Sequence, residues 1–172
     1  VMGNNFVISF QETVGDVFDP IRDRIKNSKG RIRKMGADYL AYALMDAIVD
    51  NYYKVLEEFE DKTEFLEDEI ITRPDQLVLK EIYQVKREII FLRKLVLPLR
   101  ELFRMLERTE SPLIKEPTKI YFRDIYDHVI HVTDSMEIFR EMLTGMIEVY
   151  LSSLSNKLNE VMKVLTVIAT IF

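Results

Sequence analysis

The chain of 172 residues contains no cysteine and only five glycines and five prolines. Without cysteine, disulfide bonds, thiolate metal sites and cysteine nucleophiles are all excluded. So few turn-forming residues argue against an all-β fold, and a hydrophobic content of 48% is too high for a disordered chain. The composition therefore predicts a mainly α-helical protein.

A basic surplus is missing as well, because the formal net charge is -5 and the isoelectric point lies near 5.2. Binding to a phosphate backbone needs a concentrated basic surface, so nucleic acid is not expected as a partner. The sequence has no glycine-rich phosphate loop, no nucleophile elbow and no His-Glu-x-x-His motif. We therefore expect no enzymatic activity.

Neither end of the chain reads as a natural boundary. Val164–Phe172 is an uncharged run of nine residues, whereas a helix that crosses a bilayer needs about 20 apolar residues. The run stops without a capping residue, so we expect it to be the first half of a membrane helix. Residues 5–10 read like the middle of a strand, so we expect upstream sequence to pair with them.

Apolar periodicity divides the chain into three predicted parts. Residues 1–30, with the strand-like run and a short helix over 16–26, are expected to be the end of an N-terminal α/β domain. Residues 35–110 form an acidic helical hairpin whose helices meet at a break over 72–75, and Pro98 is expected to kink the second helix. Residues 117–172 form one very long stalk helix that runs into a truncated transmembrane segment.

The long helix carries apolar residues that step by four and three, as in a coiled coil. The first part of this seam comprises Ile125, Val129, Val132, Met136, Phe139, Leu143 and Met146, and the second comprises Leu151, Leu154, Leu158, Val161, Leu165 and Ile168. A helix this long cannot bury such a stripe by itself. We therefore expect self-association of parallel helices around a common axis.

Two groups of side chains have metal-ligand chemistry. The segment 57–69 has eight acidic residues in thirteen positions, which suits Mg²⁺ but equally suits a solvated helix face. His128 and His131 each follow an aspartate by four residues, at Asp124 and Asp127. A di-iron enzyme would need Glu-x-x-His on two helices, and no glutamate lies three residues before either histidine. Hydrogen bonding is preferred for the histidines over transition-metal ligation.

Asn156 and Asn159 lie just ahead of the final apolar run, where carboxamides would be costly in lipid. Asn159 can replace part of a hydrated ion's outer shell if it faces an axial water path. The alternative is an ordinary polar residue at an interface.

Several segments together resemble the CorA magnesium transporter family. They are YFRDIYDHVI at 121–130, the whole of 149–172, GDVFDP at 15–20 and DAIVDNY at 46–52. The resemblance extends over nearly the whole chain in order. It implies a homopentameric, funnel-shaped assembly in the cell membrane, with this chain on the cytoplasmic side and the membrane reached through C-terminal helices.

The resemblance also implies functions for individual residues. Asp124 matches the aspartate that senses Mg²⁺ between subunits, and Asp46 matches a carboxylate of an adjoining, weaker site. Glu148 lies where the family often carries an acidic ring. The pore-facing positions are Asn159, Met162, Leu165 and Ala169. The implied ligand and cargo is Mg²⁺, with Co²⁺ or other divalent cations as further candidates; a zinc-transporting relative or a structural helical-bundle protein stays as the alternative.

Overall fold

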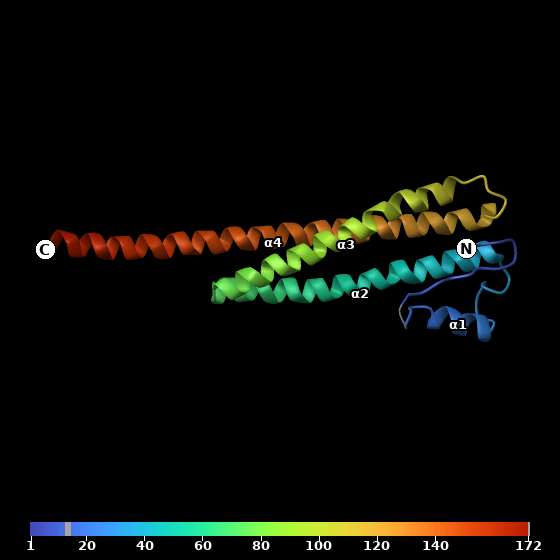
Figure 1. The fold of residues 1–172 in the computed structure, drawn as a ribbon, viewed down its shortest axis with the longest axis horizontal. Helices are drawn as coiled ribbons and strands as arrows, with labels where there is room; N and C mark the ends of the chain where they lie inside the picture. Colours follow the sequence, from blue (N-terminus) through green and yellow to red (C-terminus); the bar gives the residue numbers. More distant parts are fainter. Residues whose placement is uncertain (13–14, 172) are drawn as a thin grey trace. The chain divides into compact units, whose positions relative to one another are not determined.

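The structure is a computed structural model that describes residues 1–12 and 15–171. Within these residues it contains four α-helices, labelled in Figure 1. They are α1 (Asp19–Lys26), α2 (Ala37–Thr72), α3 (Gln76–Arg108) and α4 (Glu116–Ile171). The mainly α class and the very long C-terminal helix are confirmed. Phe172, the last residue of the predicted stalk helix, lies outside the described residues.

The strand expected at 5–10 is wrong for the described part of the chain, where only an isolated antiparallel bridge joins Met2 and Val7. The amide of Ile8 donates to the carbonyl of Val1 at 2.8 Å, and the amide of Gly3 donates to the carbonyl of Phe6 at 2.9 Å. A strand needs a neighbour that supplies a row of hydrogen bonds. Here the bonds close one short loop, so the β propensity of this run produces no ladder.

The chain divides into two compact units. The first contains Val1–Leu56 and Arg93–Asp134, and the second contains Glu57–Leu92 and Ser135–Phe172. Helices α2, α3 and α4 each contribute residues to both units. The sequence-based division at 1–30, 35–110 and 117–172 stays a prediction.

The first unit has an aromatic and aliphatic core where α1 meets the start of α2. Ile21, Ile32, Tyr39 and Ala43 are buried together there. Asp38 is also buried, because its Oδ2 accepts hydrogen bonds from the Thr118 hydroxyl at 2.7 Å and the Lys115 amide at 3.0 Å. This carboxylate therefore fastens the first turn of α2 to the first turn of α4.

The second unit is built around the turn between α2 and α3. Asp75 caps α3, because its Oδ1 accepts from the amides of Leu77 at 2.8 Å and Val78 at 2.9 Å. The apolar face of α3 packs inside this unit, where Ile82, Val85 and Ile89 are buried. Farther along, α3 continues as one helix through Pro98; the expected kink stays a prediction.

We expected the apolar stripe of α4 to require a second copy of the chain for its burial. This expectation is wrong for the first part of the seam. Ile125, Val129, Val132, Met136 and Leu143 are each 0% exposed within a single chain. Helices of the same chain therefore cover this stripe, and it leaves no apolar seam for a second copy. The second part, from Leu151 to Ile168, is exposed.

None of the helices in the described residues combines the length and the apolar character that crossing a membrane requires.

Candidate metal centre

Three side chains with metal-ligand chemistry converge in the first unit. Asp46 and Asp50 lie one turn apart on α2, so both project from the same face of that helix. His128 approaches them from α4, with its Nδ1 4.0 Å from Asp50 Oδ1. One ligand atom from each of the three side chains lies within 4.8 Å of the others. This group is called the Asp46 cluster below.

His128 is held against α2 by an aromatic contact. Its ring meets the ring of Tyr53 edge-on, with centroids 6.0 Å apart and an interplanar angle of 82°. The Nδ1 atom is buried, yet it has no hydrogen-bond partner among the described residues. The preference for hydrogen bonding at His128 therefore finds no support at this nitrogen, which instead faces the carboxylates of α2.

Asp46 is half-buried, and its surroundings disfavour the charged form. Burial raises the pKa of the Asp46 carboxyl and the negative charge of Asp50 raises it further, whereas the Tyr42 hydroxyl, His128 and Arg24 act in the opposite direction. The net direction is upward. A cation bound beside Asp46 and Asp50 would relieve their mutual repulsion, which is the electrostatic condition for a divalent-ion site.

A hollow of about 610 Å³ lies beside these carboxylates, between α1 and α2. Asp16 and Asp19 line it from the α1 side, and Asp46 and Asp50 line it from α2. Arg24 and Lys54 also line the hollow, as do Val17, Pro20, Ile21, Ala43, Ala47 and Asn51.

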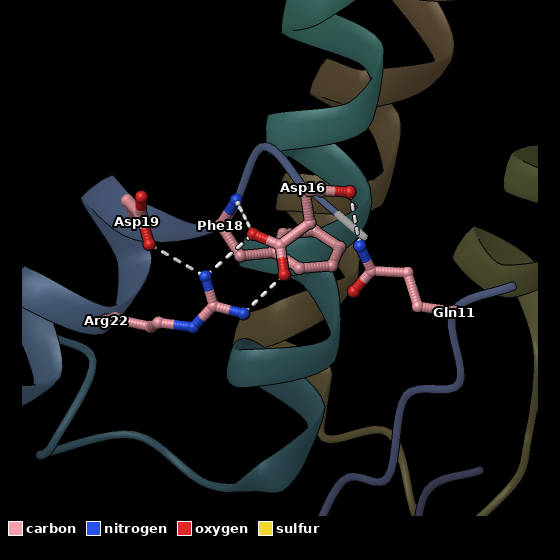
Figure 2. Close-up of polar contacts among 6 residues, drawn as sticks. Gln11, Asp16, Phe18, Asp19 and Arg22 are labelled. Atoms are coloured by element: carbon pink, nitrogen blue, oxygen red, sulfur yellow. Dashed lines mark hydrogen bonds and ion pairs between the residues drawn. The ribbon is translucent and has the colours of Figure 1, made fainter. Parts of the chain in front are cut away.

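The two aspartates of the α1 side already form ion pairs with Arg22, as Figure 2 shows. Arg22 Nη1 donates to Asp16 Oδ1 at 2.7 Å and to Asp19 Oδ1 at 2.8 Å, and Nη2 donates to Asp16 Oδ2. The Arg22 guanidinium and the amide of Phe18 lower the pKa of Asp16. Among the described residues, no lysine or arginine bridges Asp46 or Asp50 in this way, so these two carboxylates are the ones available to a cation.

The ligand types bear on which cation fits. Mg²⁺ prefers carboxylate and water oxygens, whereas Co²⁺ and Zn²⁺ also accept an imidazole nitrogen. Two carboxylates with one imidazole and open space for water can therefore serve either kind of divalent ion. In such a site, Asp46 and Asp50 would supply negative charge, and the His128 imidazole would favour Co²⁺ or Zn²⁺ over Mg²⁺.

The structure does not bring all the predicted site residues together. Asp124 is exposed on α4, one turn before His128, and is not part of the Asp46 cluster. Glu148 is exposed in the second unit, beside a hollow of about 490 Å³ that Met142 and Gly145 also line. The four predicted pore-facing positions are all exposed on α4: Asn159, Met162, Leu165 and Ala169. The assignments of Asp124, Glu148 and these four residues stay predictions.

The acidic segment 57–69 behaves as a solvated helix face for the most part. Its acidic residues are exposed except Glu69, which is half-buried. Phe59, Thr63 and Leu66 form its buried side, and the Thr63 hydroxyl donates to the carbonyl of Phe59 at 2.6 Å. No cluster that could hold a metal occurs in this segment of the described chain.

Asp50 was missed from the sequence although a signal was present. It follows Asp46 by four residues within a helix, which places two carboxylates on one face. The contribution of His128 could not be found in this way, because it lies 78 residues beyond Asp50 and its position depends on how α4 packs on α2.

A mainly helical fold and a cluster of carboxylates with an imidazole have the ligand chemistry of a divalent-cation site. Comparison with known families makes this specific, because the model of the CorA-like Mg²⁺ transporter protein family matches residues 1–172. The chain belongs to this family.

Known relatives agree with the family match. The chain is 51% identical over 172 residues to the cobalt/magnesium transport protein CorA of Thermotoga maritima, covering 100% of this chain and 49% of that protein. It is similar to the complete structure of the CorA magnesium transporter from Methanocaldococcus jannaschii, with a TM-score of 0.82 and 28% identity over 91% of this chain and 50% of that one. The soluble domain of the same archaeal protein gives a TM-score of 0.68 and 25% identity, covering 79% of this chain and 55% of that one. The chain thus spans about half the length of the curated relatives it matches.

Proposed function

We propose that the chain forms the cytoplasmic ion-sensing region and the start of the pore of a Mg²⁺ channel that opens and closes with intracellular Mg²⁺. The observation that carries this proposal is that the CorA-like family model matches the chain from its first residue to its last. The cobalt and magnesium transport named for the Thermotoga relative supports Mg²⁺ and Co²⁺ as the ions that pass.

The sensing step is electrostatic. In the proposed homopentamer, the exposed Asp124 of one subunit faces an acidic group of the next. Bare carboxylates repel each other across that interface, whereas a shared Mg²⁺ attracts both, so the ion stabilises the closed ring by its higher affinity for that state. Asp46 contributes to a second, weaker site close by, and Asp50 and His128 extend the ligand set available there.

The pore step uses the exposed C-terminal part of α4. Asn159, Met162, Leu165 and Ala169 are separated by three, three and four residues, so they share one face of the helix. In a parallel ring, the Asn159 carboxamides would contact a hydrated ion, and Met162 with Leu165 would form an apolar constriction that closes by dewetting. The exposure of Met162 and Leu165, 60% and 54%, leaves this face free for such a ring.

The test is Asp124→Ala in the full-length protein reconstituted into liposomes. We expect the Mg²⁺ concentration that half-inhibits flux to rise by about tenfold, because the bridging ion loses a carboxylate ligand. Asp127→Ala is the matched control, since Asp127 is also an exposed aspartate on the same helix. Inhibition unchanged by Asp124→Ala would contradict the sensing function. Flux of Zn²⁺ but not of Mg²⁺ would favour the zinc-transporting alternative.

A further inference from the structure

The Asp46 carboxylate has a hydrogen-bond donor that the proposed sensing mechanism does not use. Tyr42 lies one turn before Asp46 on α2, and its hydroxyl donates to Asp46 Oδ2 at 3.2 Å. Both side chains are half-buried. The bond therefore forms where water competes less than it would at an exposed surface.

The ring of Tyr42 is enclosed by other aromatic rings. Its centroid lies 5.3 Å from that of Tyr39, 4.9 Å from that of Tyr121 and 6.3 Å from that of Phe122. Arg31 Nη1 donates to the Tyr121 hydroxyl at 2.7 Å. Centroid separations between 4.5 and 7 Å are those of favourable aromatic pairs. The Tyr42 ring is therefore held on several sides, and its hydroxyl has a defined position.

We propose that Tyr42 is a positioning residue that orients the Asp46 carboxylate for a divalent cation in the Asp46 cluster. This inference rests on the proposed function. The bond engages Oδ2, so the Tyr42 hydroxyl does not occupy Oδ1, which can serve as a ligand. Residues that hold metal ligands in place by hydrogen bonds raise the affinity of the site, because the ligand geometry is set before the ion arrives.

A phenol suits this position better than a basic side chain would. It donates a hydrogen bond to the charged carboxylate without adding a positive charge that would repel the ion. Arg22 gives the contrast on the other side of the hollow, where it neutralises Asp16 and removes that carboxylate from the set available to a cation. The Tyr42 hydroxyl stabilises the negative charge of Asp46 by a hydrogen bond, and because it is neutral the full charge stays available to a cation.

The test is Tyr42→Phe in the full-length protein, because this change removes the hydroxyl and keeps the ring in its aromatic contacts. Calorimetric titration with Co²⁺ should show affinity at the Asp46 cluster falling by about tenfold. Tyr39→Phe is the matched control, since it removes a hydroxyl from the same aromatic group but no hydrogen bond joins Tyr39 to Asp46. The melting temperature in EDTA should be unchanged by Tyr42→Phe.

Asp46→Asn separates this inference from the proposed function. Tyr42→Phe should weaken Co²⁺ binding in the wild-type background and have no further effect in the Asp46→Asn background. If Asp46→Asn weakens binding and Tyr42→Phe does not, the positioning function of Tyr42 is overturned while the ion site stands. If neither change affects Co²⁺ binding, both the ion site at Asp46 and the inference are overturned. A loss of affinity that persists in the Asp46→Asn background would indicate a purely structural effect and would also overturn the inference.

Discussion

Asp38 shows how a single buried charge can be stabilising in this chain. It is 2% exposed, and burial alone would raise the pKa of its carboxyl. The hydrogen bonds from Thr118, Lys115 and the Tyr39 amide outweigh that effect, so the pKa of Asp38 is lowered from its ordinary value of 3.8. The charged form is thus the one that the folded first unit favours.

Asp38→Ala should lower the free energy of unfolding by about 1 to 3 kcal/mol, because the Lys115 amide just before α4 and the Thr118 hydroxyl in its first turn lose their acceptor. The contribution of the charged Asp38 to stability is fully present above pH 3.8 and is lost as the pH falls through its lowered pKa. The difference in unfolding free energy between wild type and Asp38→Ala should therefore shrink in acid. Urea unfolding across this pH range measures it. Asp61→Ala, at an exposed position on the same helix, is the control and should change stability by less than about 0.5 kcal/mol. An equal difference at every pH would mean that the charge of Asp38 is not involved.

The functions predicted for individual residues stay predictions, and the structure shows only where each side chain lies. Asp46, taken from the family resemblance, does lie in a cluster with metal-ligand chemistry. Asp124 does not join that cluster, although it lies four residues before His128. Spacing along one helix says which residues share a face, but not which face meets another helix. The Asp46 cluster depends on that second kind of information.

At the scale of the elements, periodicity was a reliable guide to the long helices. The helix expected over 35–71 is observed as Ala37–Thr72, and the break expected at 72–75 is present. Which residues of α2 are buried does not follow from side-chain size, because Ile48 is 43% exposed whereas Ala43 and Val49 are each 1% exposed. Small residues carry little periodic signal, yet they let helices approach closely. The strand at 5–10 failed because strands need partners, whereas helices satisfy their own backbone.

Gly145 and Gly36 differ in how much space surrounds them, so alanine at the two positions should have opposite effects on stability. Gly145→Ala should raise the free energy of unfolding by about 0.5 to 1 kcal/mol, because glycine is a poor helix former. A Cβ at Gly145, within α4, meets no atom within 4 Å. Gly36→Ala is the contrasting change and should destabilise, since its Cβ would lie 2.6 Å from Asp38 Oδ1 and 2.9 Å from Lys115 Nζ. Thermal unfolding of both variants measures the pair; destabilisation by Gly145→Ala would show that this site is more crowded than the structure indicates.

At the scale of the whole molecule, the two parts of the α4 seam have different surroundings. The part from Ile125 to Met146 is largely buried within the chain, whereas residues 154–171 are all exposed. The sequence pattern is a heptad in both parts, so the pattern alone could not tell a core from an interface. The buried part of the α4 seam ends where other helices of the chain no longer cover it.

We therefore expect self-association to depend on the second part of the seam. Leu158→Glu should shift the full-length protein in detergent toward smaller oligomers, because a carboxylate would be placed in the helix contact. Ile120→Glu is the control, since Ile120 is similarly exposed, at 57% against 59% for Leu158, but lies at the other end of α4. Light scattering coupled to gel filtration measures the mass. An oligomer unaffected by Leu158→Glu but broken by Ile120→Glu would place the contact elsewhere.

The distribution of charge along the exposed end of α4 changes at one residue. Lys163 is its last charged side chain, and only uncharged residues follow it as far as Ile171. Under the proposed function, an ammonium group on a flexible stem is held at the headgroup level, where it can reach lipid phosphates while its methylenes lie in the hydrocarbon. In that proposed assembly, Lys163 would mark the level on α4 at which the aqueous phase meets the bilayer.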